Sequence, residues 1–219
     1  MDIPVYAPVF PLSSLNLLPE TTAVYHIFEP RYRKMITSAL EGDRCIAMAL
    51  LKPGFEENYY GNPEIYPVGC LGSISRVEHL EDGNFNIILE GRERVGLGEL
   101  VQDYPFRVVR LQRLPENDLE EAFEDERHQL QVRLEYLARH ASEEVDFSPL
   151  LRGGESFRSL LNLVAKTLPL DVEAQYGLLT MDSMRERARR ILWHLDDHID
   201  TLELLKRVDP STSDDISLN

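Results

Sequence analysis

Residues 26–35 read His26-Ile27-Phe28-Glu29-Pro30-Arg31-Tyr32-Arg33-Lys34-Met35, so an apolar run ends at a proline and a basic segment follows. The run before the proline, residues 24–28, favours a β-strand. Pro30 ends the strand because it lacks an amide hydrogen, and its fixed φ suits a first helical turn. Apolar residues then recur at helical spacing from Tyr32, which predicts a helix that stops near Gly42.

Glu29 lies at the expected helix N-terminus, where a carboxylate is favoured by about 0.3–1 kcal/mol. A catalytic carboxylate is the alternative interpretation. That interpretation needs a nucleophile or a third partner for His26 and Glu29, and the sequence shows none at readable spacing. We therefore interpret Glu29 as structural.

The first half of the chain favours several short strands broken by glycine and proline. Residues 44–52 form a continuous apolar run typical of a strand buried on both faces. Residues 68–78, 85–90 and 104–111 are further predicted strands, and Asp82-Gly83 predicts a hairpin turn. Together with one early helix, this pattern indicates a barrel-like β domain.

Residues 53–67 are predicted to be a long loop that carries aromatic side chains. The peptide-binding candidates on it are Phe55, Tyr59 and Tyr60. Loop aromatics offer a large apolar contact area at low entropic cost. They can also fold back to cover the sheet, so both interpretations stay open at this point.

Two arginines after this β-rich region are further candidates for contacting a peptide. Arg92 and Arg94 are spaced to share one face of an extended segment. They could grip an acidic peptide, pair with Glu29 or lie on a solvated edge. Sheet-edge amides nearby could hold a peptide backbone.

The composition changes after residues 115–118, and helical spacing replaces the strand pattern. We predict helices at residues 119–141, 157–168, 172–181 and 184–205, with Asp118 capping the first and Asp182 or Ser183 the last. The predicted division is a β domain at 1–115, a helical subdomain at 116–206 and a disordered tail at 207–219.

Several segments occur in the order found in one known family. They are residues 9–12, 26–33, 68–74, 82–94 and 104–107, with a looser match in the helices. The chain resembles the amino-terminal substrate-recognition domain of the ATP-dependent Lon proteases over roughly residues 8–206. Departures lie before His26, where Pro19-Glu20 and Val24-Tyr25 replace the usual turn and Pro-Leu pair.

The resemblance implies an α+β fold, a PUA-like pseudo-barrel followed by a helical bundle. It identifies the structural motif residues as His26, Phe28, Glu29, Pro30, Arg31 and Tyr32. This sequence contains no Walker motif and no Ser-Lys protease motif, so we expect a non-catalytic module that stands alone and recognises polypeptides. The alternatives are a small-molecule binder or enzyme with a pocket near His26, Glu29 and Arg31, and an adaptor for a separate protease.

Charge and composition restrict the partners. The formal net charge is −15, concentrated in the second half, and such a surface repels nucleic acid. We expect unfolded or specific polypeptides as partners, with a protease or a second copy as further candidates, no membrane contact and a cytoplasmic location. We expect no cofactor and no metal, since two cysteines and the His194/His198 pair do not complete a zinc pattern.

Overall fold

A computed structural model describes residues 3–118, 123–140 and 146–208. These residues divide into two compact units. One unit contains Met1–Asn117 and Leu170–Asp182, and the other contains Asp118–Pro169 and Ser183–Asn219. We describe each unit separately.

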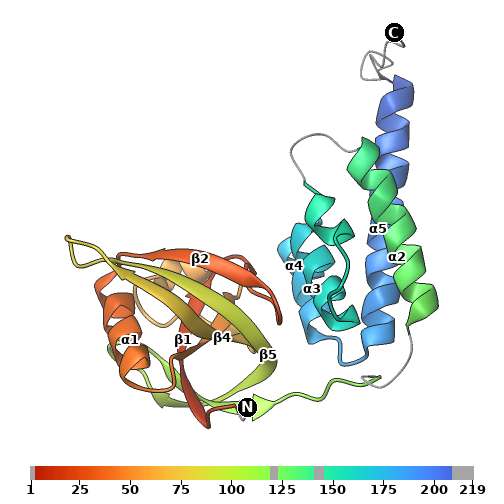
Figure 1. Ribbon diagram of the computed structural model, residues 1–219. Helices are drawn as coiled ribbons and strands as arrows, with labels where there is room; N and C mark the ends of the chain where they lie inside the picture. Colours follow the sequence, from red (N-terminus) through yellow and green to blue (C-terminus); the bar gives the residue numbers. More distant parts are fainter. Residues whose placement is uncertain (1–2, 119–122, 141–145, 209–219) are drawn as a thin grey trace. The chain divides into compact units, whose positions relative to one another are not determined.

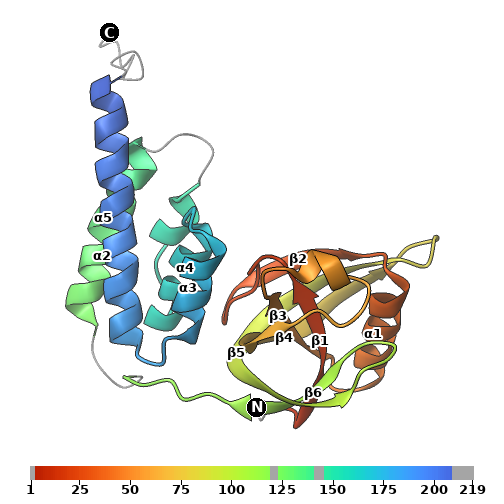
Figure 2. The same cartoon turned by 180° about the vertical axis from the view of Figure 1, so that it is seen from behind.

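The first unit is built on a mixed sheet of six strands. They are β1 (Tyr6–Leu12), β2 (Thr22–Ile27), β3 (Cys45–Leu51), β4 (Ile65–His79), β5 (Phe85–Gln102) and β6 (Val108–Arg113). Their order is β2-β5-β4-β3-β1-β6, and a further β5–β6 pairing closes the sheet (Figures 1 and 2). β1 runs parallel to β3, and the remaining pairs are antiparallel. The predicted α+β class with a barrel-like sheet is therefore confirmed.

The length of β5 explains the closure. Its first part pairs with β2 and its last part pairs with β6. The same strand therefore joins β6 to the rest of the sheet and closes the barrel. Gly91 lies where the strand bends, and a Cβ atom there would collide with the carbonyl oxygen of Leu18. The predicted hairpin is also present, since the Leu80 amide donates to Asn84 O at 2.9 Å and the Gly83 amide to Leu80 O at 2.9 Å.

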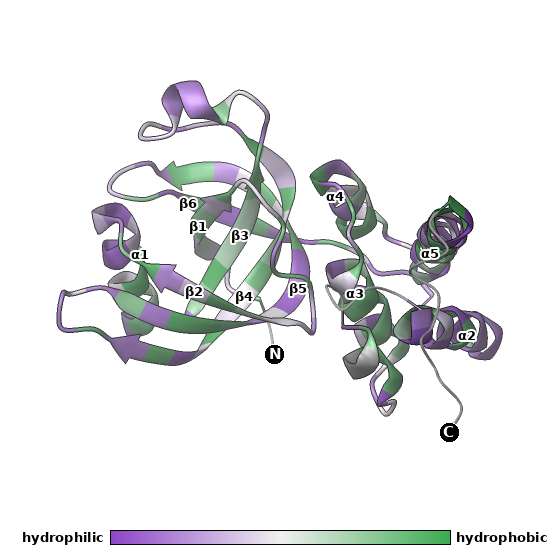
Figure 3. Ribbon diagram, turned by 90° about the horizontal axis from the view of Figure 1, so that it is seen from above, coloured by the Kyte–Doolittle hydropathy of each residue, from purple (hydrophilic) through white to green (hydrophobic). Residues whose placement is uncertain are grey.

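Helix α1 (Pro30–Glu41) starts at the proline and ends before Gly42, as predicted. Its buried face contains Tyr32, Met35, Ile36 and Ala39, and these side chains pack with Phe10, Ile27 and Ile46 inside the barrel. β3 is apolar and buried along its length, whereas the first half of β5 alternates buried with more exposed residues, and Figure 3 shows bands of both hydropathies in the sheet. Burial of this face holds α1 on the barrel.

A distant segment completes the first unit. Helix α4 (Val172–Thr180) places Tyr176 against Tyr66, with ring centroids 4.5 Å apart, and the Val68 amide donates to the Tyr176 hydroxyl at 3.2 Å. The sequence-based division assigned residues 170–182 to the helical half. The structure groups them with the β unit because their side-chain and backbone contacts are there.

The second unit is helical. It contains α2 (Glu124–His140), the short η2 (Ser148–Leu151), α3 (Phe157–Thr167) and α5 (Met184–Val208). α2 lies beside α5, and Arg133 forms a two-point ion pair with Asp196 at 2.7 and 3.0 Å (Figure 1). The Ser183 hydroxyl caps α5 by accepting from the Glu186 amide at 3.2 Å, as one of the two predicted caps.

Three sequence-based expectations about local structure are wrong. Asp118 does not cap a helix: α2 begins at Glu124, and the Asp118 carboxylate accepts from Ser183. Residues 104–107 are a loop, and β6 starts at Val108. Arg187 stands in a basic cluster at residues 185–190 whose sequence favours solvated ion pairs, yet it is buried at 1% exposure. The predicted disordered tail began at residue 207, but α5 continues to Val208; residues 209–219 of that tail and the predicted helix start at 119–122 lie outside the described residues.

Candidate functional site

The strand-to-helix corner before α1 contacts the long loop through the side chains of Glu29, Arg31 and Tyr59. Arg31 Nε donates to Glu29 Oε2 at 3.0 Å, and the Tyr59 hydroxyl donates to Glu29 Oε1 at 2.9 Å. Arg31 Nη2 also donates to the Tyr59 carbonyl at 3.2 Å, and the guanidinium lies 5.3 Å from the Tyr59 ring. Both carboxylate oxygens of Glu29 are therefore engaged in holding the loop.

The other motif residues have different environments. Pro30 occupies the first helical turn, and Tyr32 is buried against Phe10 at 4.7 Å between ring centroids. His26 is exposed on β2 and hydrogen-bonds Asn86 at 2.9 Å, while Phe28 is 61% exposed. The structure therefore does not assemble His26 with Glu29 into one catalytic group.

The loop aromatics divide between packing and exposure. Tyr59 packs on Arg31 and lies 6.3 Å from Phe55, so these two rings cover part of the unit's surface. Tyr60 meets the Tyr59 ring edge-to-face at 5.3 Å and remains 89% exposed. Among the predicted loop candidates, Tyr60 is the one most available to a ligand.

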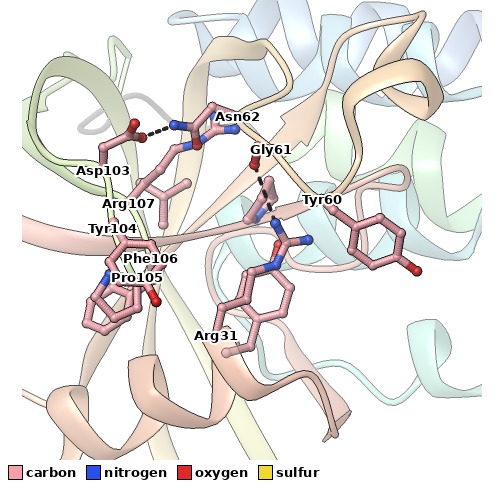
Figure 4. Close-up of a pocket in the computed structure, with 12 residues that line it drawn as sticks. Arg31, Tyr60, Gly61, Asn62, Asp103, Tyr104, Pro105, Phe106 and Arg107 are labelled. Atoms are coloured by element: carbon pink, nitrogen blue, oxygen red, sulfur yellow. Dashed lines mark hydrogen bonds between the residues drawn. The ribbon is translucent and has the colours of Figure 1, made fainter.

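A pocket of about 250 Å³ opens beside Tyr60 (Figure 4). Its lining comes from β1, α1, the long loop and the segment between β5 and β6. The lining residues are Val9, Pro11, Arg31, Tyr32, Tyr60, Gly61, Asn62, Asp103, Tyr104, Pro105, Phe106 and Arg107. Figure 4 shows Tyr104, Pro105 and Phe106 on one side and Arg31 and Tyr60 on the other.

Polar side chains fix the two loops that form the pocket walls. Arg107 Nε donates to Asn62 Oδ1 at 2.7 Å and Arg107 Nη2 to the Pro63 carbonyl at 2.6 Å. The Asn62 amide in turn donates to Asp103. Burial lowers the pKa of the Arg107 guanidinium below its usual value, and burial raises the pKa of Tyr32 to about 12. The hydrogen bonds of Arg107 and Asn62 thus hold the pocket walls in shape.

Arg92 and Arg94 are not equivalent, contrary to their predicted shared face. A β-bulge between Leu71 and Gly72 shifts the β4–β5 register at Arg92, so the simple alternation of the strand is interrupted. Arg92 is exposed. Arg94 is 3% exposed and donates to the carbonyls of Leu179 and Pro115 and to Asp182. Arg94 therefore holds the first unit together and is removed from the surface that a peptide could reach.

Sequence reasoning named only Arg31, Tyr32 and Tyr60 among the residues that line the pocket. Asn62, Asp103, Tyr104 and Arg107 were not singled out as site residues. The available signal was the short aromatic and proline run at residues 104–106, which resembles a loop as much as a strand end. No sequence spacing connects this run to Tyr60, because the pocket forms only when the sheet closes.

These elements define an α+β chain with a closed sheet and a pocket built from loops. The model of the family described as "ATP-dependent protease La (LON) substrate-binding domain" matches residues 6–197. The chain belongs to this family, and the resemblance noted in the sequence is confirmed. Membership supports a role in substrate recognition.

Curated relatives cover nearly all of this chain. A Lon protease of Flavobacterium johnsoniae is 26% identical over 209 residues, which is 93% of this chain and 25% of that protein. Lon protease 2 of Herpetosiphon aurantiacus is 30% identical over 204 residues, 90% of this chain and 24% of that protein. The chain therefore spans about a quarter of the length of these relatives.

Two solved structures share the fold. A Lon N-terminal domain protein from Xanthomonas campestris superimposes with a TM-score of 0.63 at 21% identity, covering 85% of this chain and 96% of that one. The N-terminal domain of a Lon protease from the Mycobacterium avium complex gives 0.66 at 16% identity, covering 88% and 99%. At these identities the likeness concerns the fold alone.

Two further observations concern membranes and metals. Among the described residues, every helix is too short or too polar to cross a lipid bilayer. Within residues 3–118, 123–140 and 146–208, no three His, Cys, Asp or Glu side chains gather in a way that could hold a metal ion.

Proposed function

We propose that this chain is a non-catalytic recognition module that binds unfolded or specific polypeptide segments. Its membership in a family described by substrate binding supports a role in recognition. The polypeptide as ligand is our proposal, and it is supported by an exposed aromatic surface built on fixed loops. Aromatic side chains with few rotatable bonds give large contact areas at low entropic cost.

The observation that carries this proposal is the pair of exposed tyrosines at the pocket. Tyr60 is 89% exposed and Tyr104 is 84% exposed, although both line the same pocket. A tyrosine side chain that exposes most of its ring beside an apolar recess is well placed to contact a ligand. Tyr59 packs edge-to-face on Tyr60, and Phe55 packs on Tyr59; Arg92 offers an exposed cation elsewhere on the same unit.

A small-molecule binder is the second candidate, because Arg31 does line a cavity. An enzyme at this corner is less well supported. Both oxygens of Glu29 already accept hydrogen bonds, and His26 pairs with Asn86. A general acid or base needs a free contact to its substrate. Delivery to a separate protease, self-association and a cytoplasmic location remain predictions that the binding proposal does not require.

Binding of an unfolded polypeptide tests the proposal. A reduced, alkylated and fluorescently labelled protein would be titrated with the chain, and binding would be followed by fluorescence anisotropy. We expect Tyr60→Ala/Tyr104→Ala to weaken binding about tenfold or more, since aromatic contacts of this kind carry about 1–2 kcal/mol or more each. The matched control is Tyr6→Ala, which removes a half-exposed tyrosine of β1 outside the pocket.

Two results would contradict the proposal. The first is wild-type protein that fails to bind several different unfolded polypeptides. The second is equal binding by wild type, the double variant and the control, which would remove the pocket tyrosines from the binding surface. Circular dichroism of each variant verifies that the barrel is intact.

A further inference from the structure

We infer that the pocket between Tyr60 and Tyr104 receives the carboxyl-terminal residue of a polypeptide, with the terminal carboxylate directed to Arg31, Arg107 and the Tyr32 hydroxyl. This inference rests on the proposed function and specifies which part of the polypeptide enters the pocket. The shared chemistry is a carboxylate attached to an apolar group.

Two guanidinium groups give the pocket its affinity for an anion. Arg31 and Arg107 both line it, from α1 and from the segment before β6. Each is held by hydrogen bonds: Arg31 donates to Glu29 and to the carbonyls of Tyr59 and Gly61, and Arg107 donates to Asn62 and to the Pro63 carbonyl. A guanidinium that is already fixed loses little entropy when it binds a carboxylate.

Tyr32 supplies an independent observation. The residue is only 5% exposed, lines the pocket and lies between Phe10 and the Arg31 guanidinium, 4.7 and 4.6 Å away. No hydrogen bond of its hydroxyl is found within the described part of the chain, and this hydroxyl is not one of the fully enclosed unpaired polar atoms, so it is open to the pocket. A ligand carboxylate in the pocket would accept a hydrogen bond from the Tyr32 hydroxyl and would also lie near the guanidinium groups of Arg31 and Arg107.

The neighbouring carboxylates are occupied elsewhere. Glu29 accepts from Arg31 and Tyr59, and Asp103 accepts from Asn62. They reduce the net charge of the surroundings, yet neither pairs with the Tyr32 hydroxyl. The donors available to a ligand come from Arg31, Arg107 and the Tyr32 hydroxyl, although the Asp103 carboxylate also lines the pocket.

The size and apolar lining favour a single terminal residue. A volume of about 250 Å³ is below the roughly 300–1,000 Å³ typical of pockets for larger ligands. Val9, Pro11, Pro105 and Phe106 provide apolar contacts for one side chain. A chain end fits such a recess, since the remaining residues can leave through the opening.

The test compares two labelled peptides of one sequence that ends in phenylalanine, one with a free carboxylate and one with a terminal amide. We expect the free acid to bind roughly tenfold more tightly, because a charge-assisted hydrogen bond network is lost in the amide. Equal affinity of the two peptides would overturn the inference. Equally tight binding by an amidated peptide with an internal glutamate would also overturn it, in favour of acidic side chains.

Removal of the Tyr32 hydroxyl tests whether the preference for a free carboxylate arises in this pocket. Tyr32→Phe keeps the buried ring and should reduce the preference for the acid several-fold. Tyr25→Phe is the matched control: Tyr25 also packs on Phe10, its hydroxyl likewise has no partner in the described residues, and it lies outside the pocket. An unchanged preference in Tyr32→Phe, or the same loss in Tyr25→Phe, would refute the assignment to this pocket.

The two proposals fail in different ways. Unfolded proteins that bind with no preference for a free carboxyl end would overturn this inference and leave the recognition function in place. N-acetylphenylalanine serves as a small probe, detected by its effect on protein NMR signals. If the protein bound this probe but no peptide, the pocket would recognise a small carboxylic acid, and the proposal that the carboxylate belongs to a polypeptide would be refuted.

Discussion

Arg94→Met should destabilise the first unit by about 3 kcal/mol, although Arg94 lines none of the three described pockets. Methionine retains the apolar stem but removes the donors to Leu179 and Pro115. Each charge-assisted bond contributes about 1.5–3 kcal/mol. The ion pair with Asp182 adds less than about 1 kcal/mol, since the Asp182 side chain is 47% exposed.

The loss of these bonds is partly offset, because burying the uncharged methionine avoids the free-energy cost of removing a guanidinium from water. The net loss of about 3 kcal/mol corresponds to a fall of roughly 10 °C in Tm for a chain of this size. Urea unfolding followed by the near-ultraviolet circular dichroism of the tyrosines measures it, because Tyr66 and Tyr176 lie in the same unit.

Arg92→Met is the matched control, because Arg92 is exposed on the same strand. We expect its free energy of unfolding to stay within about 0.5 kcal/mol of wild type. Asp182→Asn should cost less than about 1 kcal/mol. A stability of Arg94→Met within about 0.5 kcal/mol of wild type would refute the structural role assigned to Arg94.

Two further predictions concern the barrel itself. Gly91→Ala should lower the free energy of unfolding, measured in urea, by about 1–3 kcal/mol, because the new Cβ would collide with the Leu18 carbonyl oxygen. Gly177→Ala is the control, because the space around Gly177 is open. Equal stability of the two variants would contradict the close approach of Gly91 to Leu18. Burial raises the pKa of Tyr32 from 10.0 to about 12, so its stabilising contribution is complete below pH 10 and is lost as the pH rises through about 12. Tyr32→Phe should therefore reduce the alkaline loss of stability by about 2 kcal/mol between about pH 9 and about pH 12, and an unchanged loss would contradict the burial of this hydroxyl.

Local signals predicted much of the fold. The proline at residue 30, the apolar run of β3 and the Asp82-Gly83 turn each act within a few residues, and each element is present. Helices α3 and α4 were also predicted, because their apolar spacing and the proline at residue 169 are local features.

The pocket and the burial of Arg94 could not be predicted in the same way. Arg94 is buried because a bulge shifts the strand and because α4 returns from far along the chain. Tyr60 and Tyr104 come together only after β5 and β6 close the sheet. Arg187 was likewise not predicted to be buried, because its place in a basic cluster favoured solvated ion pairs, whereas the structure buries it on α5.

The return of residues 170–182 to the first unit has a consequence for the order of synthesis. The barrel strands end at Arg113, but Arg94 obtains its partners Leu179 and Asp182 only when the ribosome has added the intervening helices. At about 5–20 residues per second this takes roughly 3–13 seconds. During that interval the nascent barrel contains Arg94 without Leu179 and Asp182. A chaperone or a neighbouring nascent chain would therefore encounter the first unit before it is completely folded.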